Sequence, residues 1–154
     1  MRHILLILFL AIGLTTAAQV QPRQLKRAES SFRQTRISVM LENPEVREGS
    51  FLYIAPDSIR WCYDGMENVK LPKQMLSLIR QAVSGDVQTV KSMFRISWHG
   101  NDMMLTPLKN QVKRFFSTIK VTFTNDGVAK RVLLTEPNGD TTEIEFLKLK
   151  YTAK

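Results

Sequence analysis

Side chains able to carry out nucleophilic or acid–base chemistry are few in this chain of 154 residues. It has two histidines, of which His3 lies in an N-terminal segment and His99 follows Trp98 at a predicted hairpin rim. Cys62 is the only cysteine, so it cannot form an internal disulfide, and we expect a buried, inert thiol. His99 and Cys62 could form a nucleophile pair, but nothing in the sequence orients the third member of a triad.

The carboxylates also provide little evidence of a catalytic site. Asp64, Glu136 and Asp140 are the least implausible members of an acid–base pair, yet Asp64 precedes a glycine and Asp140 follows Asn138-Gly139, as turn residues do. Histidine, cysteine and carboxylate do not occur at the spacings that bind metals, so we expect neither a metal nor a cofactor. The sequence therefore favours a protein that is not an enzyme.

Large apolar side chains are, by contrast, abundant at positions that alternate as in strands. One interpretation is an ordinary core between a sheet and its helices. The other is an apolar cavity under a movable helix, with methionines suited to varied chains. In that case the concave face that binds acyl chains is lined by Phe51, Tyr53, Trp61, Phe94, Ile96, Trp98, Val121, Phe123, Ile144 and Phe146.

The elements that position these residues follow from periodicity and turn signals. Leu25, Ala28 and Phe32 have helical spacing, Gly85 is placed to end a second helix, and a short helical or turn segment begins at Thr106. The pattern predicts helices over 21–34 and 72–84, and strands over 37–41, 46–54, 58–63, 91–98, 103–105, 119–124, 128–134 and through 144–146. Strands joined by short turns indicate an α+β fold with an open, curved antiparallel sheet.

The first residues have the layout of a cleavable export signal. A basic start is followed by an apolar run over 4–14, and small residues over 15–18 precede Gln19. As a helix that run spans only ~16 Å, whereas a membrane span needs about 20 residues. We expect residues 1–18 to be a signal peptide cleaved after Ala18, and residues 19–154 to form one exported domain. With glutamine rather than cysteine at position 19, no lipid anchor is expected.

The net charge favours anionic partners. The whole chain carries a formal +8, and loss of Arg2 with the signal leaves 21 basic and 14 acidic residues, a formal +7. In an exported protein these partners are membrane headgroups or an acidic protein rather than nucleic acid. A possible docking face consists of Lys109, Lys113 and Arg114 beside an apolar stripe of Leu108, Val112 and Phe115. A merely solvated basic face is the alternative.

Several segments resemble the LolA-like outer-membrane lipoprotein carriers, as a short variant of that family. The segment 49–61, GSFLYIAPDSIRW, looks like the family's early hairpin, and 31–35 is similar to the Phe-x-Gln segment that ends its first helix. Residues 105–107 are similar to a Leu-x-Pro element, and 136–146 to a late hairpin. The order of these segments, together with the export signal, carries the resemblance along nearly the whole mature chain.

The resemblance implies an incomplete, open β-barrel covered by two or three short helices, whose apolar interior shields lipoprotein acyl chains in the periplasm. It further implies a monomer that receives cargo from an inner-membrane exporter and gives it to an outer-membrane acceptor. Two positions depart from the family. Only nine residues separate Trp61 from Leu71, where relatives have further strands, and Ala55 precedes the turn proline where many relatives carry arginine. Arg60 is the nearest substitute for that arginine.

Two other functions remain open at this point. The cargo could be a non-protein lipid or glycolipid, because the sequence does not identify it. The chain could also be a non-catalytic interaction module of the cell envelope whose core is fully packed.

We predict that the mature protein begins at Gln19 and stays in the supernatant as a monomer. The reason is the short apolar run, which ends in small residues that signal peptidases accept and is not followed by cysteine. N-terminal sequencing of the exported protein checks the site. Retention of residues 4–14, or pelleting with membranes that salt does not reverse, would contradict it.

Overall fold

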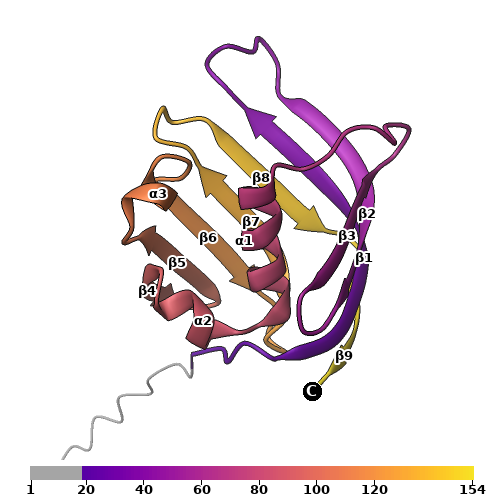
Figure 1. Cartoon of the computed structure of the whole chain (residues 1–154), viewed down its shortest axis with the longest axis vertical. Helices are drawn as coiled ribbons and strands as arrows, with labels where there is room; N and C mark the ends of the chain where they lie inside the picture. The colour runs from indigo at the N-terminus through magenta and orange to yellow at the C-terminus, as the bar shows by residue number, and fades with distance from the viewer. Residues whose placement is uncertain (1–18) are drawn as a thin grey trace, which may run out of the picture.

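The computed structural model describes residues 19–154 (Figure 1). The signal peptide predicted over 1–18 lies outside this range. Within it, no helix has both the length and the apolar character needed to cross a bilayer.

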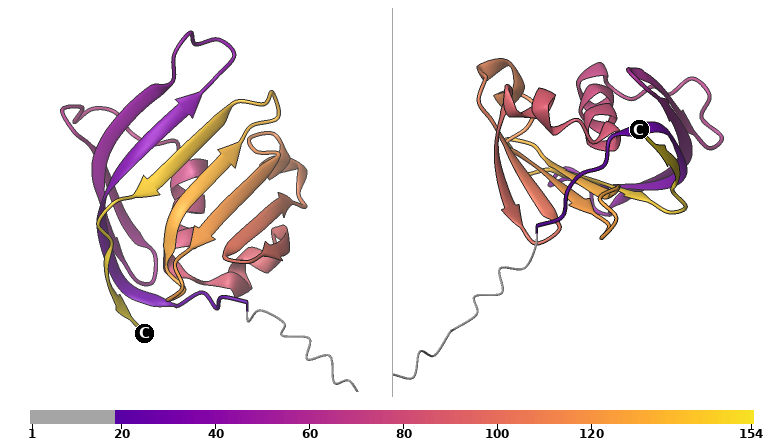
Figure 2. Two further views of the ribbon diagram at one scale, coloured as in Figure 1. Left: turned by 180° about the vertical axis from the view of Figure 1, so that it is seen from behind. Right: turned by 90° about the horizontal axis from the view of Figure 1, so that it is seen from below.

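Antiparallel strands form one nine-stranded sheet that is not closed on itself. The strands pair in the order β3-β2-β1-β8-β7-β6-β5-β4, and β9 pairs with β1. Three short helices accompany the sheet, which confirms the predicted α+β class and open, curved sheet (Figures 1 and 2). The elements are β1 (Leu25–Ile37), β2 (Glu45–Ile54), β3 (Ser58–Tyr63), α1 (Lys73–Ser84), α2 (Val87–Lys91), β4 (Phe94–His99), β5 (Asp102–Pro107), α3 (Asn110–Lys113), β6 (Thr118–Phe123), β7 (Ala129–Thr135), β8 (Thr141–Phe146) and β9 (Lys150–Ala153).

The long strand β1 connects two parts of the sheet. It pairs with β2 over most of its length, with β8 along its C-terminal half and with β9 along its N-terminal half. The register shifts between Leu25 and Arg27, as at a β-bulge, which bends a strand and increases its twist. The sheet therefore curves around the side on which α1 lies (Figure 2).

Strand register gathers the large apolar side chains on this concave face. Phe51 lies opposite Trp61, and Val132 lies between Val121 and Ile144. Because side chains alternate between the two faces of a strand, the residues in step with these share the same face. Helix α1 crosses that face and buries Leu78, Ile79, Ala82 and Val83 against it.

The helix predicted over 21–34 is wrong, because residues 25–34 belong to β1 and residues 21–24 have no regular secondary structure. Its inward positions are Leu25, Ala28, Ser30, Phe32 and Gln34. The bulge lengthens the spacing between the inward residues Leu25 and Ala28 from two residues to three. From Ala28 onward every second residue points inward, but two of these, Ser30 and Gln34, are polar, so the apolar residues alone do not show the alternation. Leu25, Ala28 and Phe32 alone therefore imitate the spacing of a helix.

Other local predictions also need correction. Residues 38–41 are the turn of the β1–β2 hairpin rather than a strand, and β4 begins at Phe94 because α2 precedes it. Asp86 caps α2 by accepting a hydrogen bond from the backbone N–H of Thr89 at 3.4 Å. Strand β9 was not predicted. Cys62 is exposed rather than buried, because its neighbours on β3, Trp61 and Tyr63, take the inward positions.

We predict that Gly49→Ala destabilises the protein by about 1–3 kcal/mol, the usual cost of overpacking. A Cβ at Gly49 would lie 2.0 Å from the carbonyl oxygen of Cys62 and 2.7 Å from the Phe32 ring, so β2 and β3 would have to separate. Urea unfolding measures the loss. Ser50→Ala, the exposed neighbouring position, is the control, and an equal loss in both variants would contradict the packing argument.

Candidate functional site

Aromatic rings dominate one half of the concave face, over β1, β2, β3 and β8. Phe32 stacks on Trp61 with ring centroids 3.8 Å apart. Phe51 lies 4.9 Å from Phe146 and 5.9 Å from Trp61. Gly49 leaves the space that the Phe32 ring occupies. This half of the face is therefore a continuous apolar surface.

The other half of the face, over β4, β5 and β6, has a smaller aromatic pair. Trp98 and Phe123 have ring centroids 5.7 Å apart, and Met103 and Val121 are buried beside them in the same core. Val132 of β7 lies between the two halves, opposite Ile144 of β8, and both side chains are fully buried. The two groups thus belong to one apolar cluster that spans the sheet.

The structure places all ten of the predicted lining residues in or against this cluster. Trp61, Ile96 and Trp98 are half-buried. The seven others are at most 7% exposed: Phe51, Tyr53, Phe94, Val121, Phe123, Ile144 and Phe146. The side chains of this cluster pack against one another, and α1 buries its own apolar stripe against the cluster.

A few polar groups lie within this apolar surface. The Tyr63 hydroxyl donates a hydrogen bond to Gln34 Oε1 at 2.8 Å, and both side chains are buried. The Arg47 guanidinium lies 5.6 Å from the centroid of the Tyr63 ring, which fits a cation–π contact. The indole Nε1 of Trp61 is buried without a hydrogen-bond partner. Burial raises the pKa of the Tyr63 hydroxyl above its usual value of 10.0.

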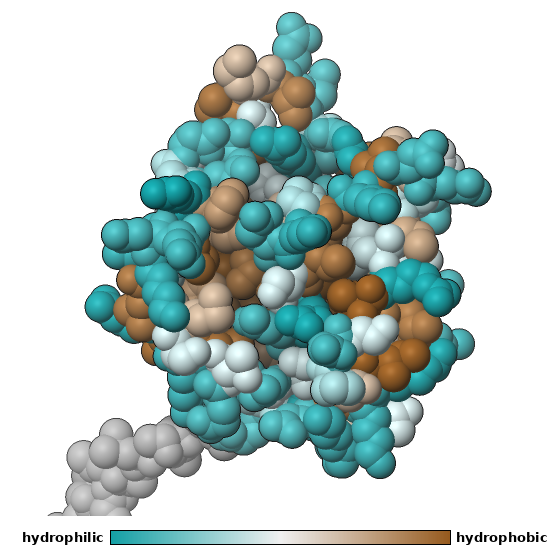
Figure 3. Space-filling view, in the orientation of Figure 1, coloured by the Kyte–Doolittle hydropathy of each residue, from teal (hydrophilic) through white to brown (hydrophobic). Residues whose placement is uncertain are grey.

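A cleft of about 400 Å³ opens between α1 and α3. Leu78 and Phe116 lie at its base and belong to the buried core, so the cleft leads toward the concave face. Figure 3 shows apolar side chains in a hollow beside α1, surrounded by polar ones. Gln81 Oε1 is buried and has no hydrogen-bond partner. The cleft is lined by Lys73, Gln74, Ser77, Leu78, Gln81, Met93, Gln111, Val112, Phe115 and Phe116.

Sequence reasoning identified only part of this cleft. The spacing predicts Val112 and Phe115, whereas none of the α1 residues that line the cleft with them is a predicted site residue. The predicted docking residues Lys109, Lys113 and Arg114 lie in and beside α3 and are all exposed. The apolar stripe next to them is largely exposed too: Leu108 is 47% and Phe115 44% exposed, and Val112 is half-buried.

Arg80 was also missed, and it ties α1 to the sheet. Its guanidinium donates a hydrogen bond to the carbonyl oxygen of Asp57, in the turn between β2 and β3, at 3.3 Å. Arg60, the nearest substitute in the sequence for the arginine that many relatives carry before the turn proline, is exposed and lines a groove on the outer face of the sheet. The arginine that contacts the turn after Ala55 therefore comes from the helix and not from the hairpin.

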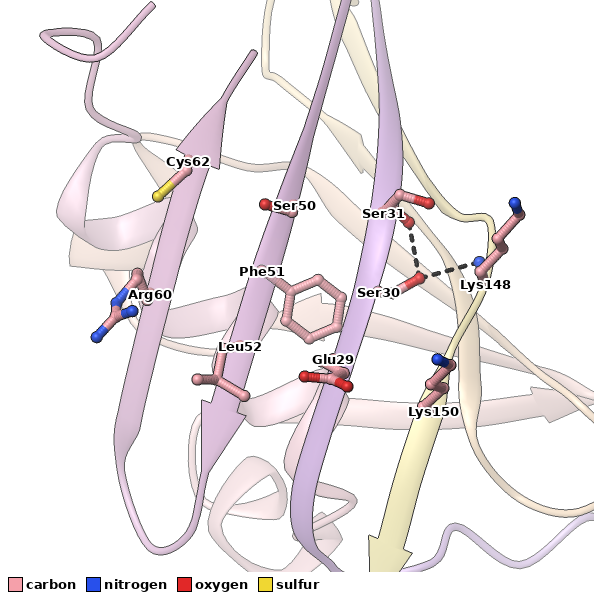
Figure 4. A pocket seen from close by; sticks show the side chains of 10 residues that line it. All are labelled: Glu29, Ser30, Ser31, Ser50, Phe51, Leu52, Arg60, Cys62, Lys148 and Lys150. Carbon is pink, nitrogen blue, oxygen red and sulfur yellow. Dashed lines mark hydrogen bonds between the residues drawn. The ribbon is translucent and has the colours of Figure 1, made fainter.

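The outer groove is a second hollow, of about 410 Å³, where β8 leaves β1 (Figure 4). Ser30 Oγ accepts a hydrogen bond from the backbone N–H of Lys148 at 3.1 Å and donates one to the carbonyl oxygen of Ser31 at 2.7 Å. Arg60 and Cys62 border it, and their side chains point away from the sheet. Its mixed polar lining does not match the apolar character of the concave face.

The candidate acids have structural roles or lie in solvent. Asp64 is exposed. Asp140 is a turn residue, as predicted, but it is buried and accepts a hydrogen bond from the backbone N–H of Val39 at 3.3 Å. The Ser38 hydroxyl, and then the Val39 N–H, hold the pKa of Asp140 below its usual value. Among residues 19–154 no three side chains of histidine, cysteine, aspartate or glutamate are grouped as metal ligands would be.

Comparison with known proteins finds similar solved structures but no match at the level of sequence. No protein-family model matches the chain, and no curated protein matches it. Among solved structures, a domain named as an outer membrane lipoprotein-sorting protein from Vibrio parahaemolyticus is 7% identical, with a TM-score of 0.41 over 85% of this chain and 87% of that one.

A LolA superfamily protein from Nitrosomonas europaea is 5% identical, with a TM-score of 0.32 over 84% of this chain and 88% of that one. A DUF1329 family protein from Desulfovibrio piger is 14% identical, with a TM-score of 0.31 over 82% and 86% of the two chains. At these identities and TM-scores the likeness to these structures assigns neither a ligand nor an activity to this chain.

We predict that stability falls as the pH rises above about 10, and that Tyr63→Phe makes this fall shallower. Tyr63 ionises at a higher pH in the folded chain than in the unfolded one, so its contribution is complete below the unfolded pKa of about 10 and is lost as the pH rises through the folded value. The free energy of unfolding in urea, measured from about pH 8 to about pH 11, checks this.

At neutral pH the same variant should lose about 1–3 kcal/mol, because Gln34 keeps a buried acceptor without its donor. Tyr151→Phe, at an exposed tyrosine, is the control and should change neither quantity. If both variants have the alkaline slope of the wild type, burial of Tyr63 is not the cause.

Proposed function

We propose that this protein is a non-catalytic carrier that holds lipoprotein acyl chains between α1 and the concave face of the sheet. In this scheme it receives them in the periplasm from an inner-membrane exporter and ferries them toward an outer-membrane acceptor. The observation that carries the proposal is the way the concave face is covered: a wide apolar surface lies under one short helix that is held almost entirely by apolar contacts.

Helix α1 is attached to the sheet by few polar bonds. Within residues 19–154, the Arg80–Asp57 bond is its only side-chain hydrogen bond to a strand or strand turn, and it makes no ion pair. Apolar contacts do not depend on one geometry, so an acyl chain can replace them. Moving the helix therefore breaks one exposed hydrogen bond and exchanges one apolar surface for another.

The two ends of α1 differ in how firmly they are held. At the C-terminal end, Gly85 has a left-handed φ of 71°, and a Cβ there would lie 1.9 Å from the carbonyl oxygen of Arg23. At the N-terminal end, Pro72 provides no side-chain cap, and Lys73 and Gln74 border the cleft. This asymmetry supports a hinge at Gly85, with the N-terminal end of α1 as the part that opens.

The free energies involved are comparable, as reversible carriage requires. Exposing a buried valine, leucine or isoleucine costs about 1.5–3 kcal/mol, and α1 buries three such side chains and one alanine. Each methylene that enters the site contributes ~0.8 kcal/mol, so about ten of them offset the exposed helix residues. A long acyl chain can therefore displace α1, and α1 can return when the chain leaves.

The cleft supplies an entry with suitable chemistry. Its base is apolar and continuous with the core, and its rim carries Lys73, Gln74 and Gln111. Gln81 Oε1 lacks a donor. A polar head attached to an acyl chain could be held at this rim and could donate a hydrogen bond to Gln81.

One observation favours a second function, that of an envelope interaction module with a fully packed core. Seven of the ten residues proposed to contact acyl chains are at most 7% exposed, as in an ordinary core. The two functions differ in a measurable way, because only a carrier changes the surroundings of Trp61 and Trp98 when lipid is added. Saturable changes in tryptophan fluorescence support the carrier, and their absence supports the interaction module.

We predict that tying α1 to α3 abolishes lipid binding. Ser77 and Gln111 line the cleft from the two helices, so in a Cys62→Ser background Ser77→Cys and Gln111→Cys can be joined by a cleavable bis-maleimide. Binding of a long-chain lipopeptide, followed by tryptophan fluorescence, should disappear on cross-linking and return when the linker is cleaved, because cleavage allows α1 to move again.

The matched control joins Ser31→Cys to Ser50→Cys, paired positions of β1 and β2 on the outer groove. This link should leave lipid binding unchanged. If the lipopeptide binds equally well with α1 tied to α3, the ligand does not enter under the helix and the proposed carriage is wrong.

A further inference from the structure

The two ends of the sheet carry connections of different chemistry. Because β1, β3, β5 and β7 run toward the same end, that end carries the β1–β2 tip, the β3–α1 loop, the β5–β6 connection with α3, and the β7–β8 turn. We call it the apical end; it lies uppermost in Figure 1. The opposite end carries the three short turns at 55–57, 100–101 and 124–128.

Exposed apolar side chains are concentrated at the apical end. Single exposed apolar residues are normal on a protein surface, but a group of them marks an interaction site. Val39 and Met40 at the β1–β2 tip are 84% and 87% exposed, and Figure 3 shows apolar side chains on this projecting hairpin. Of eleven exposed large apolar residues among 19–154, eight lie at this end: Ile37, Val39, Met40, Leu41, Val46, Met66, Leu108 and Phe115.

The β1–β2 tip is a formed turn that presents these side chains outward. The backbone N–H of Leu41 bonds to the carbonyl oxygen of Ser38 at 3.1 Å, and that of Met40 bonds to Ser38 Oγ at 3.2 Å. The N–H of Val39 donates a hydrogen bond to the carboxylate of Asp140, in the turn between β7 and β8. These bonds fix the base of the tip, so the exposure of Val39 and Met40 belongs to the folded conformation.

Positive charge lies at the same end. The segment 108–117 contains Lys109, Lys113 and Arg114 and no acidic residue, and in the described part of the chain none of the three forms an ion pair. Three of the acids at this end are paired with arginines, whereas Glu42 in the tip and Asp64 and Glu67 in the β3–α1 loop are exposed and, among residues 19–154, form no ion pair. Glu136 and Asp140 lie 3.6 and 3.5 Å from Arg36, and Glu45 pairs with Arg47. The basic residues around α3 are therefore available to an anionic partner.

We propose that the apical end docks on the surface of an anionic phospholipid bilayer. The β1–β2 tip enters the boundary between headgroups and acyl chains, and the basic residues around α3 contact the phosphates. Projecting apolar side chains flanked by cations match that boundary, which accepts apolar groups to a depth of about 5–10 Å. A folded protein partner would instead require a groove that fits a projecting tip.

Docking in this orientation brings the cleft to the membrane. Phe115 is exposed beside α3 and also lines the cleft, and Lys73 at the start of α1 lies on the same rim. Acyl chains could pass between bilayer and cleft without crossing water. Docking itself needs no cargo, so it can be tested apart from the proposed carriage.

The first experiment measures co-sedimentation with vesicles. The full mature chain should bind vesicles of equimolar phosphatidylcholine and phosphatidylglycerol, and not phosphatidylcholine alone. Salt should weaken this binding, because exposed charges are screened over about 8 Å at physiological ionic strength. Lys109→Gln/Lys113→Gln/Arg114→Gln should weaken it about 100-fold, since each basic residue near an anionic surface contributes about fivefold.

The matched control removes three exposed lysines near the opposite end, by Lys26→Gln/Lys130→Gln/Lys154→Gln, with the same change in net charge. It should weaken binding far less than the variant around α3. If the two variants weaken binding equally, the attraction comes from net charge alone and the proposed surface is wrong.

The second experiment tests insertion of the tip. In a Cys62→Ser background, a polarity-sensitive fluorophore on Met40→Cys should shift to the blue when anionic vesicles are added, whereas the same fluorophore on Asp57→Cys, at the opposite end, should not. Val39→Ser/Met40→Ser keeps the charge and should still reduce vesicle binding severalfold. Both side chains are more than four-fifths exposed, so folding should be unaffected, as urea unfolding can confirm.

An unshifted Met40 fluorophore on bound protein would overturn the insertion of the tip, and absence of binding to anionic vesicles would overturn the docking surface. Loss of lipopeptide binding with vesicle docking retained would contradict the proposed carriage but not this inference.

Discussion

The structure depends on covering the concave face of a sheet that does not close. Strands β3 and β4 end the order of pairing without joining each other, so the curvature encloses one side of an apolar surface and leaves the other side open. Water there would contact Phe51, Phe123 and Phe146, and burying such side chains is the main favourable term in folding. Helix α1 covers this surface, and burial of its stripe of Leu78, Ile79, Ala82 and Val83 stabilises the helix in that position.

Close backbone contacts determine how that cover is fixed. The segment before β1 crosses the lower end of the molecule, where the N–H of Arg23 bonds to the carbonyl oxygen of Gly127 at 2.8 Å. Gly85 and Gly127 both have positive φ and leave no room for a Cβ beside that segment. The C-terminal end of α1 is thus held at a crowded crossing, while its N-terminal end borders a cleft.

The two ends of the molecule also differ at the surface. Short turns occupy the end where the chain crosses itself, and the longer connections, the cleft and most exposed apolar side chains occupy the apical end. Asp140 fixes the base of the β1–β2 tip, because its carboxylate accepts a hydrogen bond from the backbone N–H of Val39 and lies beside Arg36. The cleft beside α1 and the exposed apolar side chains of the β1–β2 tip therefore lie on the same side of the molecule.

The sequence by itself determined the fold class, most strands, helix α1 with its end at Gly85, and ten of the side chains in or against the apolar cluster. These follow from alternation and turn residues, which are local properties. The tertiary structure alone decided that Leu25–Ile37 is a strand, since a bulge and inward Ser30 and Gln34 disguise its period. It also decided the cleft, the Arg80–Asp57 contact and the apical grouping of apolar residues, because each joins segments distant in the chain whose meeting depends on strand order and register, which no local pattern encodes.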